Sequence, residues 1–273
     1  MITHNGKQVT LAMRNRKAIN LIARNGKAMF GEYGDIAYTA IDKAAKAVIL
    51  AEYGKQVWSD VRDYAKAHPA IVPFINQDPH LACSISPNSN KERWLVGDGK
   101  AYINTGVKGN NPIDIQIDVM FETFSSSFSV LSARKSNYRF YACFIDSQKW
   151  CVPNGTDFSV VGSPVAKKSY RINTSFKSGA FTLAENGTQL YKGGGVTNTD
   201  LDLYLFARKY NNSIDSFAPS GTKAGRCILG TQKDLIPHLT ADGQCGMLDL
   251  VTYTFHPNAN TQGQFTIAIT DKE

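Results

Sequence analysis

The stretch PIDIQIDVMFETF, residues 112–124, alternates apolar and polar side chains almost without interruption. Its apolar positions are Ile113, Ile115, Ile117, Val119 and Phe121, and its polar positions are Asp114, Gln116, Asp118 and Glu122. Successive side chains of a β-strand point to opposite faces of the sheet, so one set faces a core and the other faces water. The stretch therefore predicts a half-buried strand of an antiparallel sheet.

Later segments of the chain repeat this pattern. SYRINTSFK (169–177) and DLDLYLFAR (200–208) alternate in the same way, and FTLAENGTQLYKGG (181–194) holds two short strands around Asn186-Gly187. Asn-Gly favours tight hairpin turns because both residues tolerate positive φ angles. Many short strands separated by turn signals, with almost no helical period, predict an antiparallel two-sheet sandwich over residues 94–273.

Composition agrees with a folded protein. The chain has 273 residues, of which 42% are hydrophobic and 19% are charged, as expected for a globular protein with a core. The start, MITHNGKQVTLAMRNRK, lacks the apolar run of a signal peptide, and no stretch reaches the ~18 apolar residues of a membrane span. We therefore expect a protein that folds in a cytoplasm and has no membrane partner.

The five cysteines are an odd number and contain no C-x-x-C pair. Buried free thiols are therefore expected, rather than a disulfide framework or a structural zinc site. His80 and Cys83 form a lone pair without a second pair to complete a metal site. No loop of the D-x-D-x-D kind, which would favour calcium, occurs in the sequence. We expect no metal ion and no cofactor.

The net charge of +7 is concentrated at the N-terminus. Residues 1–31 contain basic residues and no acidic residue. Arms that bind nucleic acid interleave basic residues with glycine and stacking aromatic residues, whereas this arm is rich in aliphatic residues that favour burial. Docking on a protein partner is the favoured interpretation, and nucleic acid is not expected. The candidate anchoring residues are Lys7, Arg14, Arg16, Lys17, Arg24 and Lys27.

The arm also contains a ten-residue repeat. NGKQVTLAMR, NRKAINLIAR and NGKAMFGEYG begin at Asn5, Asn15 and Asn25, and each opens with a turn pair. So small a set of β units leaves one face bare. Residues 1–34 are therefore expected to form a basic β-repeat anchor, completed either by packing on the chain's own domain or by other subunits.

Two further segments precede the sandwich. Residues 35–68 carry apolar residues at helical spacing, with Asp35 as N-cap and a break at Gly54. This helical stripe is expected to form a dimer or trimer seam or to cover the local core. Residues 69–93 contain four prolines and clustered Asn and Ser, which predicts an irregular linker between domains.

The closing stretch LIPHLTADGQCGMLDLVTYTF, residues 235–255, admits three interpretations, namely a catalytic loop, a metal loop or a structural closure. Together with WLVGDGKAYINTGVK (94–108) and LYLFARKYNN (203–212), it resembles segments of the concanavalin A-like (laminin-G-like) jelly-roll domain of virion proteins from phages of gut Bacteroidetes, crAss-like and related. The resemblance covers about residues 94–270, and the order of three separate segments makes it moderately specific.

This resemblance implies a virion protein that is assembled in the cytoplasm of the host bacterium. The implied role is a head fibre or capsid decoration protein, with a tail fibre or collar component as the alternative. Its implied partners are capsid or other virion proteins, further copies of itself in a dimer or trimer, and surface glycans.

The resemblance also favours a structural closure for residues 235–255. We expect Ile236 and Leu239 to point inward and Asp242-Gly243 to form the turn. Gly246 would allow the backbone a close approach, and Asp249 would accept backbone N–H bonds.

No constellation of residues predicts catalysis. Glycosidases need two carboxylates ~5–10 Å apart, whereas Asp114 and Asp118 lie roughly 13 Å apart along a strand at ~3.3 Å per residue. The five histidines are scattered and fit no hydrolase motif. We therefore expect a protein that is not an enzyme. The alternative is a polysaccharide-degrading enzyme that uses Asp118 or Glu122 in an unrecognised acidic pair.

Sugar binding on a sandwich combines an aromatic platform with side chains that donate and accept hydrogen bonds. Residues of these types near the predicted loops and the polar strand face are candidates for glycan binding. Each of them also has a plainer interpretation, as an aromatic core residue or a polar rim residue. The candidates are Tyr138, Tyr141, Trp150, Asn154, Asp157 and Arg208.

Overall fold

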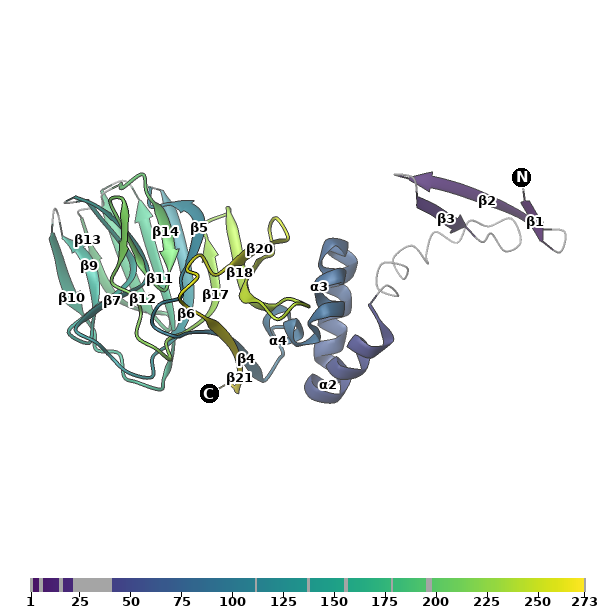
Figure 1. Ribbon diagram of the computed structural model, residues 1–273, viewed down its shortest axis with the longest axis horizontal. Coiled ribbons are helices and arrows are strands. Elements are labelled where there is room, and N and C mark those ends of the chain that lie inside the picture. The colour runs from purple at the N-terminus through teal and green to yellow at the C-terminus, as the bar shows by residue number, and fades with distance from the viewer. Residues whose placement is uncertain are drawn as a thin grey trace.

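The computed structural model describes residues 41–272 except 111, 137, 155–156, 178 and 195–197. It also describes the backbone of three N-terminal strands, β1 (Ile2–His4), β2 (Lys7–Arg14) and β3 (Lys17–Leu21). These strands pair antiparallel in the order β1-β2-β3 (Figure 1). The third repeat unit, the predicted N-cap Asp35 and the basic residues Arg16, Arg24 and Lys27 lie outside the described residues.

One large sheet of the sandwich has the path β10-β9-β8-β7-β14-β5, with β15 and β16 attached beside β7. Neighbouring strands pair antiparallel except β15, which runs parallel to β7. The strands are β5 (Ile103–Lys108), β7 (Ser127–Lys135), β8 (Tyr138–Asp146), β9 (Lys149–Asn154), β10 (Asp157–Val161), β14 (Asp202–Leu205), β15 (Arg208–Tyr210) and β16 (Ser213–Asp215).

The second large sheet has the path β13-β12-β11-β6-β17-β18-β19-β20, and β4 joins β21 to β17. All of its pairs are antiparallel. The strands are β4 (Lys91–Gly97), β6 (Ile113–Met120), β11 (Ser169–Lys177), β12 (Ala180–Glu185), β13 (Thr188–Gly193), β17 (Lys223–Leu229), β18 (Lys233–Leu239), β19 (Cys245–Asp249), β20 (Thr254–Pro257) and β21 (Phe265–Asp271).

The main core lies between these two sheets. The apolar set of β6 is buried there beside aromatic residues such as Phe140 and Phe176, whose rings stack 3.8 Å apart. The prediction of a mainly β protein with a jelly-roll sandwich, preceded by a short β-repeat arm and a helical segment, is therefore confirmed. All five cysteines are free thiols, and all except the half-buried Cys245 are buried, which confirms that prediction also.

A helical segment, defined here as residues 41–85, precedes β4. It comprises α2 (Lys43–Ala67), η2 (Pro69–Ile71), α3 (Val72–Gln77), η3 (Pro79–Leu81) and α4 (Ala82–Ile85). Gly54 has a φ of +84° and kinks α2 at the predicted break. Among the described residues, the structure has no helix long and apolar enough to cross a membrane.

The prediction of an irregular linker over residues 69–93 is wrong. Residues 69–85 form short helices, and β4 already begins at Lys91. Pro69, Pro73 and Pro79 stand in the first turns of these helices. Proline suits that position because its fixed φ is helical and the N–H that it lacks would be unpaired there anyway. The prolines therefore start helices instead of preventing them.

The helical segment packs against the outer face of the second sheet, as Figure 1 shows beside β17 and β18. Its buried residues Ile49, Val61 and Ile75 form a second core with Ile236 of β18 and Leu248 of β19. The apolar stripe of α2 thus covers a local core, which is one of the two outcomes expected for it.

The stretch 235–255 forms a structural closure. Gly243 has a φ of +85° in the turn between β18 and β19, and a Cβ on Gly246 would lie 2.4 Å from the carbonyl oxygen of His256. The buried carboxylate of Asp249 accepts the backbone N–H groups of Asp234 and Val251, at 3.1 and 3.0 Å. The prediction for Leu239 is wrong, since this residue is 38% exposed. Ile236 is buried, but beneath the helical segment and not in the main core.

Candidate functional site

The outer face of β6 and β11 is polar, as the alternation requires. In the register of the two strands, Asp118 lies opposite Arg171, Gln116 opposite Asn173, and Asp114 opposite Ser175. Directly opposed residues of an antiparallel pair lie on the same face. The strands thus present rows of carboxylate, amide, hydroxyl and guanidinium groups on a rigid support.

Two pockets lie side by side on this face and share Gln116 as a lining residue. The junction pocket, of about 460 Å³, lies between residues 83–87, at and just after the end of the helical segment, and strands β4, β6, β11 and β17. The sheet pocket, of about 480 Å³, lies over β6, β11, β12 and the end of β17. We call the two pockets together the outer-face groove.

The two pockets differ in chemistry. The lining of the sheet pocket contains uncharged groups that both donate and accept hydrogen bonds, including Gln116, Asn173, Thr182 and Thr231, beside the acidic Asp114 and apolar residues such as Ile228. The junction pocket is lined by charged groups. Its lining contains Lys91, Arg93, Arg171, Arg226 and Lys272 together with the acidic residues Glu92 and Asp118.

Ion pairs fix two of these arginines. Arg171 donates from Nε and Nη2 to the Asp118 carboxylate at 2.7 and 3.1 Å, and Arg226 donates from the same two atoms to Asp234 at 2.7 and 2.5 Å. The hydrogen bonds that the two guanidinium groups donate to these carboxylates raise the pKa of both groups above the ordinary arginine value. Both side chains therefore stay charged and hold a defined orientation.

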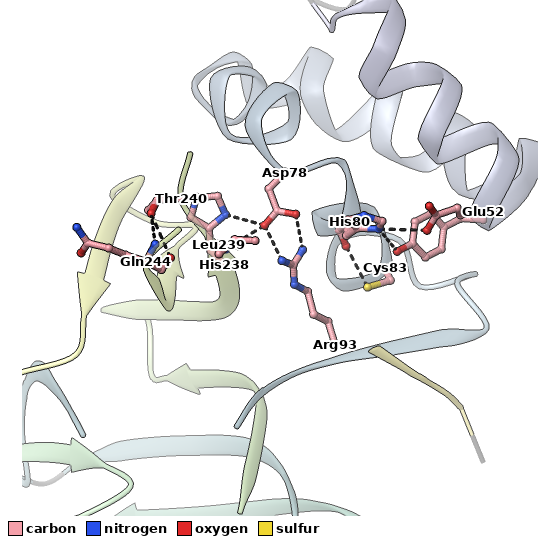
Figure 2. Close-up of polar contacts among 10 residues, drawn as sticks. Glu52, Asp78, His80, Cys83, Arg93, His238, Leu239, Thr240 and Gln244 are labelled. Atoms are coloured by element: carbon pink, nitrogen blue, oxygen red, sulfur yellow. Dashed lines mark hydrogen bonds and ion pairs between the residues drawn. The ribbon is translucent and has the colours of Figure 1, made fainter. Parts of the chain in front are cut away.

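A buried polar cluster fixes the helical wall of the groove. Asp78, which lies between α3 and η3, receives hydrogen bonds from Arg93 Nη1 and Nη2 at 2.8 and 2.6 Å (Figure 2). His238 Nδ1 and the Leu239 backbone N–H lie 3.1 and 3.0 Å from the same carboxylate. The cluster joins the helical segment to β4 and β18.

The electrostatics of this cluster favour an ionised Asp78. Burial alone would raise its pKa, but the hydrogen bonds from His238 and Arg93 lower the pKa from the usual 3.8 to about 2. Since the carboxylate accepts, His238 Nδ1 carries the proton of this contact. Nε2 of His238 is buried without a hydrogen-bond partner among the described residues.

A second polar contact ties α2 to η3. Tyr53 Oη lies 2.9 Å from His80 Nδ1. Glu52 lies 3.2 Å from the same nitrogen (Figure 2). Burial raises the pKa of Tyr53, so its hydroxyl keeps its proton. The Cys83 thiol donates to the His80 carbonyl oxygen at 3.1 Å. Among the described residues, no group of three or more His, Cys, Asp or Glu side chains is placed to hold a metal ion.

The predicted glycan-binding residues lie away from this groove. Tyr141 and Arg208 meet at 3.1 Å on the outer face of the other sheet, but both are buried, and Arg208 is bound to Asp215 through two hydrogen bonds of 2.8 Å. Tyr141 stacks on Phe144 with ring centroids 4.4 Å apart. The buried Tyr141 ring is therefore not a platform for a ligand.

The remaining candidates are dispersed. Trp150 is buried in the main core, where its indole N–H donates to Glu185 at 2.7 Å, so a role in stacking on a sugar is excluded by packing. Tyr138 is 53% exposed, and Asp157 is exposed and paired with Arg139 at 2.6 Å. The side chain of Asn154 lies outside the described residues.

Of the anchoring candidates, Lys7, Arg14 and Lys17 lie on β2 and β3.

Sequence reasoning did not identify Arg171, Arg226, Gln116 or Asn173 as site residues. The sequence feature that could have identified them is the set of polar residues on the alternating strands, which includes Gln116, Arg171 and Asn173. The strand register, which brings these residues into one groove, is not visible in the sequence. Asp118 pairs with Arg171, and Glu122 forms a short contact with Lys223. These pairings give the two acidic residues ordinary ion-pair roles.

No family model and no curated protein sequence matches the chain. Similar solved structures include a candidate carbohydrate-binding protein from Bacteroides ovatus ATCC 8483, with 10% identity over 67% of this chain and 60% of that chain and a TM-score of 0.43. Domains LG4-5 of the mouse laminin α1 chain match with 15% identity over 65% and 45% of the two chains and a TM-score of 0.40. A Trypanosoma rangeli sialidase matches with 10% identity over 50% and 30% of the two chains and a TM-score of 0.37.

The chain spans less than two thirds of the length of each of these three proteins. At such identities and TM-scores, the likeness concerns the fold alone. The comparisons nevertheless correct one expectation. We expected a protein that is not an enzyme, whereas several of the similar structures are sialidases, so that expectation is withdrawn.

Proposed function

We propose that the protein binds glycans in the outer-face groove. The observation that carries this proposal is the pair of adjoining pockets, of about 460 and 480 Å³, on one face of a rigid sheet. Their size suits small ligands. Sugar hydroxyls donate and accept hydrogen bonds at once, and Gln116, Asn173 and Thr182 supply matching groups on three neighbouring strands.

The proposal is tested by screening the full-length protein against a panel of surface polysaccharides and following hits with Asn173→Ala and Gln116→Ala. Both variants should lose affinity, because each removes an amide from the groove. Lys149→Ala, an exposed residue of β9 in the other sheet, is the matched control and should bind like the unchanged protein. Binding that survives both groove substitutions would place the glycan site elsewhere.

We further propose that the protein is a virion component, a head fibre or capsid decoration protein that displays the jelly roll. A tail fibre or collar component is the alternative. Two features of the sequence support the proposal, namely the resemblance over residues 94–270 and the six basic residues of the N-terminal arm. In this arrangement, residues 1–34 dock on capsid protein and the chain assembles as a dimer or trimer.

Deleting residues 1–34 tests the virion proposal, because the helical segment and the sandwich keep all their described contacts in such a chain. The deletion should abolish attachment to phage particles and leave glycan binding unchanged. Normal decoration of particles by the shortened protein would contradict the anchor. The mass of the full-length protein in solution tests the oligomer.

A further inference from the structure

A row of alternating charges crosses four neighbouring strands beneath the junction pocket. Arg171 of β11, Asp118 of β6, Arg226 of β17 and Asp234 of β18 follow one another in the order of the sheet. Asp118 also contributes to the raised pKa of Arg226, in agreement with its place between the two arginines. Two guanidinium groups thus flank one carboxylate at the pocket.

The backbone is shaped to bring Arg226 into this row. Between Ala224 and Cys227 the register of β17 against β6 shifts, so Gly225 and Arg226 together oppose Asp118. Such a β-bulge redirects a side chain and is common beside functional sites. A Cβ on Gly225 would lie 3.1 Å from the Asp118 Cβ and 3.2 Å from the Trp94 ring. Glycine therefore lets the bulge pack closely over the Trp94 ring.

The cations of the row are more exposed than their partners. The side chain of Arg171 is 56% exposed and that of Asp118 is 18%, while Arg226 is 38% exposed and Asp234 is 20%. Each arginine donates hydrogen bonds from Nε and Nη2 to its carboxylate. The remaining nitrogen, Nη1, makes no hydrogen bond to another described residue. The pocket surface therefore offers fixed N–H donors. The exposed Lys272 adds a positive charge to the lining, and Glu92, whose charge adds to the raised pKa of Arg171, adds a negative one.

We infer that the junction pocket is the subsite for a carboxylate-bearing sugar unit, such as a uronic or sialic acid. This inference rests on the proposed function and names its ligand class. Paired planar guanidinium groups match the geometry of a carboxylate better than that of a neutral sugar. The adjoining sheet pocket, with its amides and hydroxyls, receives the neutral units of the same glycan. The acidic unit therefore lies at the end of the groove nearest the helical segment.

The test compares acidic oligosaccharides with their methyl esters, which keep the shape of the sugar and remove its charge. Binding of the full-length protein is measured by calorimetry at low and high salt. The acid should bind about tenfold more tightly than the ester, and salt should weaken only the acid. Arg171→Gln and Arg226→Gln should lower the affinity for the acid about tenfold and leave that for the ester unchanged. Arg171→Lys should lose part of the affinity, because it keeps the charge and removes the planar fork.

Two controls separate the possible failures. Asn173→Ala should weaken acid and ester alike, and Arg134→Gln, on the other sheet, should weaken neither. Unchanged thermal unfolding of the variants shows that the fold persists. Equal binding of acid and ester would overturn the anionic subsite and leave glycan binding intact. Absence of binding to either form across the whole panel would overturn both the subsite and the proposed function.

Discussion

The outer face of the second sheet has two unlike halves. Over β18 and β19 the outward face includes the apolar residues Ile236 and Leu248, and the helical segment buries them completely. Over β6 and β11 the outward residues are Gln116, Asp118 and Asn173, and the face carries the groove instead. The inward residues of both halves belong to the same main core.

The difference between the halves follows from the outward residues. A strand that is apolar on both faces must be covered on both, whereas an alternating strand can leave one face to water. The covered half therefore fixes the helical segment in place, and the helical segment in turn supplies one wall of the junction pocket. The boundary between the two halves therefore contributes both to the stability of the fold and to the shape of the candidate site.

The largest effect is expected when the helical segment, which covers the apolar half of this face, is removed. A chain that begins at Lys91 lacks the helical segment, exposes Ile236 and Leu248, and leaves the buried Arg93 without Asp78. We expect it to aggregate or to lose its cooperative thermal transition, because both an apolar face and an unpaired charge remain. The chain lacking only residues 1–34 should melt cooperatively. A Lys91 chain that melts in the same way would show that the cover is dispensable.

The next largest effect concerns the buried charge at the boundary. Asp78→Ala should lower the free energy of unfolding by about 3–5 kcal/mol, because it leaves the Arg93 guanidinium buried and unpaired. Asp114→Ala is the matched control on the open half, where the exposed carboxylate lies 3.8 Å from Lys177, and should change little. Urea denaturation measures both. Equal losses would remove the distinction between the halves.

A direct comparison substitutes one outward residue in each half. Ile236→Ala should cost about 2–5 kcal/mol through lost burial and the cavity left behind. Gln116→Ala should change the free energy of unfolding by only about 0.5 kcal/mol or less, as for other surface positions. A shift in the denaturation midpoint for Ile236→Ala but not for Gln116→Ala, with unchanged slopes, would establish the difference in the free energy of unfolding. A large loss of stability in Gln116→Ala would contradict the open character of that half.

The smallest expected effect is a dependence on pH. The pKa of Asp78 is lowered in the folded chain from 3.8 to about 2, so its contribution to stability is complete above pH 3.8 and is lost as the pH falls through 2. The contribution amounts to about 2 kcal/mol. The unchanged protein should therefore lose about 2 kcal/mol more than Asp78→Asn between pH 5 and pH 2. Parallel pH profiles of the two proteins would contradict this assignment.

Much of the architecture was predictable because it depends on local pattern. The alternation of residues 113–121, the hairpin at Asn186-Gly187, the kink at Gly54 and the turn at Gly243 all appear where the sequence places them. Each depends mainly on residues close together in the chain, whose turn and backbone preferences are local. The linker prediction for residues 69–93 was wrong because prolines that start short helices resemble prolines that prevent them.

The candidate site was less predictable, since it depends on contacts between distant segments. Trp150 and Arg208 have the residue types of a sugar site, but one lies in the core and the other is tied to Asp215. By itself the sequence determined which residues of each strand face water, because side chains alternate with a period of two. Only the tertiary structure decided that Arg171, Asp118 and Arg226 share one row. It also decided that the helical segment forms one side of the pocket above this row. Register and docking are set by packing between segments far apart in the chain, and no local pattern records them.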